Sequence, residues 1–147
     1  MRLNGSWAEG HSGVWLPTIS IDVRAFDESW RKSRFLIDTG ADITVLRYDL
    51  LYELQLEPES DDGSFLSGVG GESTSVRVAT TLRFERDDGI LVSFNGTFHG
   101  FTDPTALDIS VLGRDVLGHF AAIVDRPGKL VTLLAGQHRY EIFAPGL

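Results

Sequence analysis

Short runs of alternating apolar and polar residues, separated by glycine-containing turns, are the feature that most constrains the fold of this chain. Residues 15–23 alternate in this way, and so do residues 74–86, which the turn Asp87-Asp88-Gly89 joins to an expected strand at residues 90–101. A period of two places successive side chains on opposite faces of a strand. Because the chain also has 16 glycines and many β-branched residues, the sequence predicts a mainly β domain.

The remaining elements are expected to be short. The pattern predicts helical turns at residues 47–56 and 114–120, and strands at residues 31–37, 43–46, 110–112, 121–125 and 129–134, the last two joined by a hairpin at Arg126-Pro127-Gly128. We interpret Asn95-Gly96 as a bulge, and the basic run at residues 31–34 as a solvated hairpin turn. Residues 1–13 are expected to form a loose N-terminal arm before one domain at residues 14–147.

The net charge and the composition of the chain limit the classes of molecule that it can be expected to bind. The chain has 13 Lys and Arg against 21 Asp and Glu, which gives a net charge of -8 and argues against nucleic acid as a partner. It has no cysteine, so disulfides, thiolate metal sites and cysteine nucleophiles are excluded. The first 13 residues lack the apolar segment of a signal peptide, and the apolar run at residues 120–124 is too short to span a bilayer. We therefore expect no membrane association and a cytoplasmic location.

The segment FLIDTGAD at residues 35–42 contains the strongest candidate for a catalytic residue. An apolar strand delivers Asp38 into a turn, and Gly40 lets the backbone reverse sharply. Taken alone, Asp-Thr-Gly is weak evidence and is better explained as an ordinary Asx turn. Two further segments change that reading: SGVGG at residues 67–71, and VLGRDVL at residues 111–117, which begins 73 residues beyond Asp38.

These three segments, in this order, resemble the retropepsin family of aspartic proteases, and the resemblance spans residues 15–134. It implies an all-β, closed, barrel-like acid protease fold with one short C-terminal helix. It also implies an aspartic endopeptidase that is active as a homodimer on peptide or protein substrates, without metal or cofactor. Only one Asp-Thr-Gly occurs in the chain, so a two-fold partner would have to supply the second aspartate.

The same resemblance assigns roles to individual residues. Asp38, Thr39 and Gly40 are the expected catalytic residues, and Asp42 and Arg114 are the expected structural ion pair. The expected substrate-binding residues, mostly apolar side chains and glycines of a mobile flap, are Leu36, Ala41, Val45, Gly68, Val69, Gly70, Ile109 and Val111. Ala41 stands where some aspartic proteases carry a Ser hydroxyl that stabilises a charged carboxylate, so we expect a mildly acidic pH optimum.

Two other readings remain open from the sequence. The first is a dimeric peptide-binding or assembly module that has the protease fold and little or no turnover, although the intact Asp38-Thr39-Gly40 argues against it. The second is an unrelated β-barrel ligand binder in which Asp-Thr-Gly is a chance turn. That reading does not explain residues 111–114.

Overall fold

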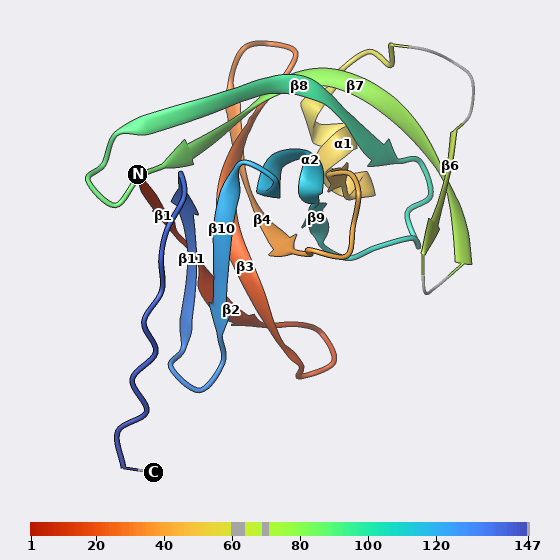
Figure 1. Cartoon of the computed structure of the whole chain (residues 1–147). Coiled ribbons are helices and arrows are strands. Elements are labelled where there is room, and N and C mark those ends of the chain that lie inside the picture. Colours follow the sequence, from red (N-terminus) through yellow and green to blue (C-terminus); the bar gives the residue numbers. More distant parts are fainter. Residues whose placement is uncertain (60–63, 69–70, 147) are drawn as a thin grey trace.

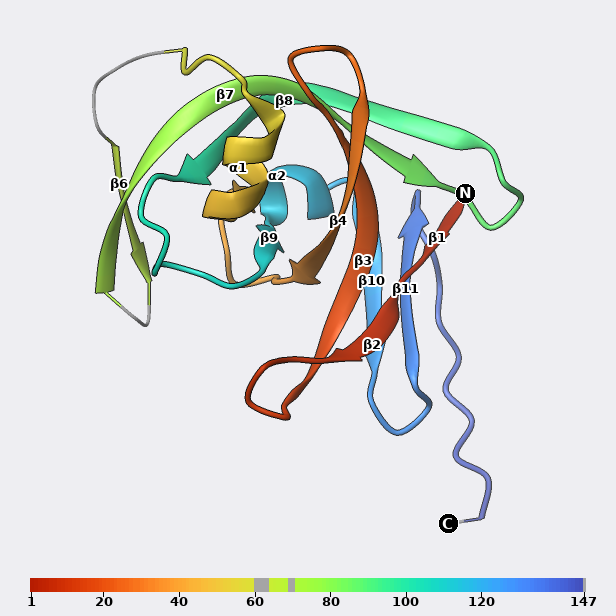
Figure 2. The ribbon, with the colours of Figure 1, turned by 180° about the vertical axis from the view of Figure 1, so that it is seen from behind.

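A ring of β-strands forms the body of the chain (Figures 1 and 2). The computed structural model describes residues 1–59, 64–68 and 71–146. One sheet has the strand order β2-β3-β4-β9-β5-β8-β7-β6, and an additional pairing between β3 and β7 joins Asp22 to Arg83 and Val23 to Leu82. That pairing closes the sheet on itself, which confirms the expected all-β, barrel-like fold class.

The elements follow one another along the chain as short strands with two short helices between them. They are β1 (Arg2–Asn4), β2 (Ser6–Glu9), β3 (Trp15–Arg24), β4 (Trp30–Ile37), β5 (Val45–Leu46), α1 (Tyr48–Leu54), β6 (Ser64–Gly68), β7 (Gly71–Glu85), β8 (Leu91–Phe101), β9 (Ser110–Leu112), α2 (Arg114–Leu117), β10 (Phe120–Asp125) and β11 (Leu130–Ala135). In the part of the chain that the structure describes, no helix has the length and apolarity needed to cross a membrane.

The core lies inside the ring, because the alternating strands turn their apolar faces inward. Its fully buried members come from all parts of the ring and from α1, and they include Ile21, Val23, Phe35, Leu46, Leu50, Leu54, Val78, Leu82, Phe84 and Leu112. Burial of such side chains contributes about 1.5–3 kcal/mol each. Both helices pack against this core through buried residues, Leu50 and Leu54 in α1 and Val116 and Leu117 in α2.

A second, three-stranded sheet has the order β1-β11-β10 and lies beside the ring (Figure 1). It corrects one expectation, since residues 1–13 do not form a loose arm. β1 pairs with β11, and β2 pairs with β3 with Ser6 opposite Thr18. Residues 2–9 are thus ordered by pairing with strands far away in the sequence.

Two local interpretations were also wrong. Residues 31–34 lie within β4, where Arg34 pairs with Ser20 and Arg31 with Val23, so they are not a turn. β7 and β8 pair without interruption past Asn95 and Gly96, so no bulge is present there. The hairpin turn at Asp87-Asp88-Gly89 is confirmed by the hydrogen bond from Arg86 N to Ile90 O, 2.8 Å, and by the positive φ of Gly89, 82°.

Candidate active site

Asp38 lies at the end of β4, where the strand leaves the sheet. β4 pairs in parallel with β9, and the ladder extends one residue further because Asp38 N donates to Leu112 O at 3.1 Å. The chain then turns, with Ala41 N donating to Asp38 O at 3.2 Å. Asp38 is half-buried, while Thr39 and Gly40 are exposed. The aspartate is therefore presented, half-buried, at the end of an interior strand of the sheet.

The turn itself holds the Asp38 carboxylate. Gly40 N donates to Asp38 Oδ1 at 2.9 Å, which satisfies one carboxylate oxygen locally. A Cβ at position 40 would stand 3.2 Å from the same oxygen. Glycine at this position therefore keeps the space beside the carboxylate open.

The segment after β9 supports the loop from behind. Arg114 N donates to Ala41 O at 2.8 Å, and the Arg114 guanidinium donates to Thr39 O at 2.8 Å. The guanidinium also forms an ion pair with Asp42, the partner expected for it from the sequence. Both side chains of this pair are largely exposed, 53% and 81%, so the pair itself contributes little stability and the bonds to loop carbonyls matter more.

A buried polar group beneath the loop was missed by sequence reasoning. Thr44 is fully buried. Its hydroxyl donates to Asp115 Oδ1 at 2.7 Å and accepts from Gly113 N at 3.1 Å. Asp115 Oδ2 accepts from Thr44 N at 2.9 Å. The available signals were a Thr in an otherwise apolar short strand and an Asp in the first turn of a helix.

Apolar side chains form a row across β4, β9 and β5, on the face of the sheet toward which Leu36 of β4 points. Leu36 stands opposite Val111 in the β4–β9 pair, and Val45 stands opposite Val111 in the β5–β9 pair. Residues that face one another on neighbouring strands share a face of the sheet. Leu36 and Ile109 are half-buried, and Val45 and Val111 are buried. The structure thus brings together three of the residues expected to bind substrate, Leu36, Val45 and Val111, and places Ile109 directly before β9.

The other expected substrate-binding residues lie elsewhere. Ala41 is half-buried in the loop beside Asp38. Gly68 ends β6 and pairs with Gly71 at the start of β7, so the expected flap is a hairpin of these two strands. This hairpin extends away from the ring (Figures 1 and 2). Val69 and Gly70 lie outside the described residues.

His99, which lies close to the site, has a pKa below the ordinary value of a histidine. His99 on β8 stands opposite Val45, and its backbone N–H donates to Thr44 O at 3.2 Å. Burial lowers the pKa of His99 below 6.5, the nearby Arg77 charge lowers it further, and Asp115 opposes the shift. The His99 imidazole, whose strand is bonded to the buried Thr44, therefore favours its neutral form.

Comparison with known proteins places the chain among proteases with this arrangement. A sequence model of the aspartyl protease family matches residues 22–116, which include Asp38, Thr44 and Arg114. No curated protein sequence matches the chain.

Two solved structures share its architecture. A retropepsin-like aspartic protease from Rickettsia conorii aligns with a TM-score of 0.58 at 18% identity, over 90% of this chain and 90% of that chain. The EIAV protease complexed with the inhibitor HBY-793 aligns with a TM-score of 0.53 at 22% identity, over 70% of this chain and 86% of that one. At these identities the likeness establishes a common fold.

Proposed function

Because the chain belongs to the aspartyl protease family, we propose that it is an endopeptidase that becomes active as a homodimer, with one Asp38 from each copy. The observation that carries the proposal is the placement of Asp38. It stands half-buried at the end of β4, on a loop held by Arg114, next to the apolar row that contains Leu36. Since the chain has a single Asp-Thr-Gly, the second carboxylate has to come from another copy.

Two carboxylates at a two-fold axis would divide the acid and base functions. Like charges held close together do not both ionise, so the pair shares one proton. The ionised Asp38 would take a proton from a bound water, which attacks the scissile carbonyl, and the protonated Asp38 would hydrogen-bond the developing oxyanion. Thr39, exposed on the same loop, would hydrogen-bond across the axis and hold the two loops together.

The substrate would bind as an extended strand between the apolar row and the β6–β7 hairpin. Backbone hydrogen bonds would supply affinity, and side-chain pockets would supply selectivity. The row of Leu36, Val45, Ile109 and Val111 favours apolar side chains at the cleaved bond. Gly68, Val69, Gly70 and Ala41 are proposed to contact the peptide from the hairpin and the loop.

A cleavage assay tests this function. The protein is incubated with a mixed peptide library, with and without pepstatin, beside Asp38→Asn and the matched surface variant Asp87→Asn. Asp87 is an exposed carboxylate in the turn between β7 and β8, where it pairs with Arg2 of β1. We expect cleavage that pepstatin inhibits, that Asp38→Asn abolishes and that Asp87→Asn retains. Peptide binding without cleavage would instead support the binding-module reading, and cleavage by Asp38→Asn would overturn the proposed site.

A further inference from the structure

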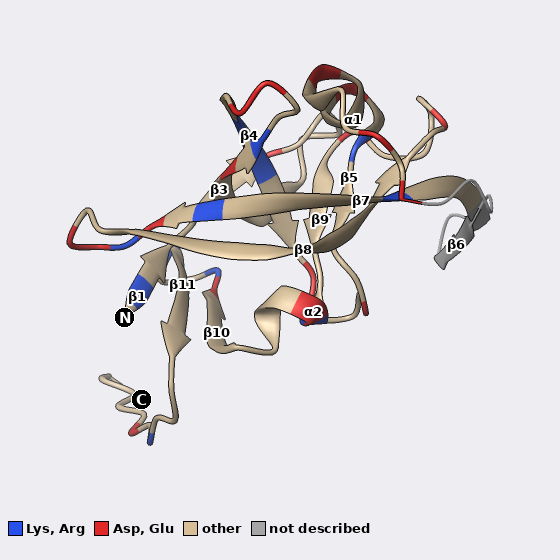
Figure 3. Cartoon of the chain, turned by 90° about the horizontal axis from the view of Figure 1, so that it is seen from above, with Lys and Arg blue, Asp and Glu red and all other residues tan. Residues whose placement is uncertain are grey.

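The outward face of β4 continues from the apolar row into a basic region. Along this strand Ser33, Phe35 and Ile37 are buried, whereas Lys32 and Arg34 are exposed and Leu36 is half-buried. Alternation therefore places Lys32, Arg34 and Leu36 on one face, and the strand delivers Asp38 two residues beyond Leu36. Figure 3 shows the basic residues of β4 in a chain whose charges are mostly acidic.

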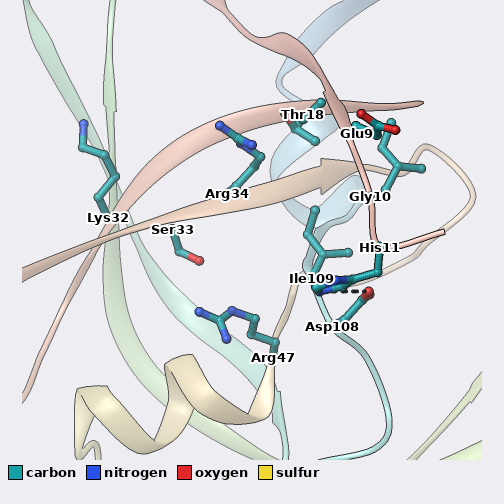
Figure 4. A pocket seen from close by; sticks show the side chains of 12 residues that line it. Glu9, Gly10, His11, Thr18, Lys32, Ser33, Arg34, Arg47, Asp108 and Ile109 are labelled. Carbon is teal, nitrogen blue, oxygen red and sulfur yellow. Dashed lines mark ion pairs between the residues drawn. The ribbon is translucent and has the colours of Figure 1, made fainter. Parts of the chain in front are cut away.

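A pocket of about 510 Å³ opens over this basic region. Arg34 and Lys32 line it from β4, Arg47 lines it from the residue before α1, and Ile109 lines it from the loop before β9 (Figure 4). Ile109 is therefore shared between this pocket and the residues proposed to bind substrate.

The opposite side of the pocket is formed by the loop between β2 and β3. His11 from this loop lies 3.8 Å from Asp108, the neighbour of Ile109 (Figure 4). Glu9 also lines the pocket. The charged groups around the space are thus three cations, the two carboxylates of Glu9 and Asp108, and one histidine, with Asp108 already facing His11.

The three cations differ in how their charges are compensated. Lys32 Nζ lies 3.8 Å from Asp22 Oδ1, and Arg47 Nη1 lies 3.1 Å from Asp49 Oδ2. Arg34 has no acidic partner or hydrogen-bond acceptor within the described ranges 1–59, 64–68 and 71–146. An arginine beside two other cations, in a chain of net charge -8, attracts an external carboxylate.

We propose that Arg34 forms, with Arg47 and Lys32, a subsite that binds an acidic side chain of the peptide substrate. The inference rests on the proposed protease function and adds a substrate class to it. Side chains on one face of a strand repeat about every 7 Å. An extended peptide whose apolar side chain contacts Leu36 would therefore place the side chain two residues away beside Arg34.

Peptides that differ at one position test the subsite. An apolar peptide that the protein cleaves is made with Glu, Gln or Lys at each position from two to four residues on either side of the cleaved bond. The ratio of kcat/KM for the Glu and Gln peptides is measured at low and high salt for the wild type, Arg34→Ala and Arg34→Glu. Arg139→Ala serves as the matched control, because Arg139 is exposed in the C-terminal segment.

We expect a preference for Glu over Gln of about threefold to tenfold at one position, decreasing with salt. Arg34→Ala should bring the ratio close to one, Arg34→Glu should favour the Lys peptide, and Arg139→Ala should keep the wild-type ratio. Equal rates for Glu, Gln and Lys at every position, or a ratio that survives Arg34→Ala, would overturn the inference while leaving the protease function intact.

A binding measurement separates the two proposals. If no peptide is cleaved, the proposed function fails, and fluorescence anisotropy of labelled Glu and Gln peptides on Asp38→Asn decides the inference alone. Tighter binding of the Glu peptide that Arg34→Ala removes supports the subsite. Equal binding of the two peptides overturns it.

Discussion

At the scale of single residues, the site combines a half-buried acid, Asp38, with a half-buried histidine, His99, whose pKa is lowered by burial. Asp38 accepts its hydrogen bond from within its own turn, from Gly40 N at 2.9 Å. His99 lies on the protein side of the site, with its Nδ1 3.4 Å from Ser75 Oγ. Asp38 is presented to a ligand. His99 belongs to the packing that supports the loop.

His99 should make the stability of the fold depend on pH. Burial lowers its pKa below 6.5 in the folded chain, so the unfolded chain binds this proton at a higher pH than the folded chain. The contribution to the free energy of unfolding is therefore present above pH 6.5 and is lost as the pH falls toward the lower folded pKa. We expect the melting temperature of His99→Gln to fall less than that of the wild type between about pH 7.5 and about pH 5.

The control for this measurement is His138→Gln. His138 is exposed beyond β11, where its ring nitrogen lies 2.8 Å from Ala135 O. It should show the wild-type pH dependence. An identical fall in melting temperature for His99→Gln and the wild type would contradict the assignment.

At the scale of elements, the junction between β9 and α2 holds the loop that carries Asp38. β9 pairs with β4 up to Ile37, and the first residue of α2 donates to Ala41 O. Gly113 lies between the two elements, where a Cβ would overlap the backbone of Ile43. The close approach is possible because glycine has no side chain, and it lets Gly113 N reach the Thr44 hydroxyl.

Thr44→Val should weaken this junction. Valine has nearly the same shape but leaves the buried Gly113 N without its acceptor. The exposed Asp115 loses one donor to Oδ1 but keeps the bond from Val116 N at 2.9 Å. Buried groups left unsatisfied cost about 1–3 kcal/mol. We expect a corresponding loss in the free energy of unfolding by urea titration, together with a lower kcat because the Asp38 loop is less firmly held.

Thr97→Val is the matched control, since the exposed Thr97 hydroxyl makes only long contacts of 3.3 Å with Glu59. It should change the free energy of unfolding by less than about 0.5 kcal/mol. Wild-type stability and activity in Thr44→Val would show that the buried group does not support the loop.

At the scale of the whole molecule, the three-stranded sheet has an edge suited to pairing with a second copy. Within the described part of the chain, β10 pairs with β11 on one side and with no strand on the other. Its residues are apolar from Phe120 to Val124, and Val124 is 44% exposed. An exposed apolar stretch of an edge strand tends to pair with another chain, and the one charge in β10, Asp125, lies at the end of the strand. A two-fold partner at this edge would extend the sheet.

Val124→Lys should therefore shift the equilibrium toward monomer. A charge on an edge strand opposes pairing, and in the proposed homodimer the loss of the partner removes the second Asp38. We expect a smaller sedimentation coefficient and a loss of specific activity at low protein concentration, with partial recovery at high concentration.

Ile90→Lys, a similar change at a residue 53% exposed in the turn between β7 and β8, should sediment and cleave like the wild type. A fully active Val124→Lys monomer would contradict the shared site. An unchanged dimer would place the interface elsewhere.

Much of the site was predictable from sequence because its signals are local. The alternation of apolar residues determined the strands 15–24, 71–85 and 91–101 to within a few residues, since the period of two is a property of the strand itself. The segments at residues 35–42 and 111–117 identified the candidate site through their resemblance to the retropepsin family, and the pairing of β4 with β9 brings the two segments together. Arg114 was paired with Asp42 by that resemblance, and the structure places them together.

Tertiary structure alone decided which distant residues meet. Residues 2–4 pair with residues 132–134, a contact that no short pattern in a polar, glycine-containing segment predicts. Thr44 reaches Asp115 across 71 positions, and Arg34 comes to share a pocket with Ile109. Periodicity specifies which face of a strand a side chain occupies, but the neighbour on that face depends on strand order and on closure of the ring.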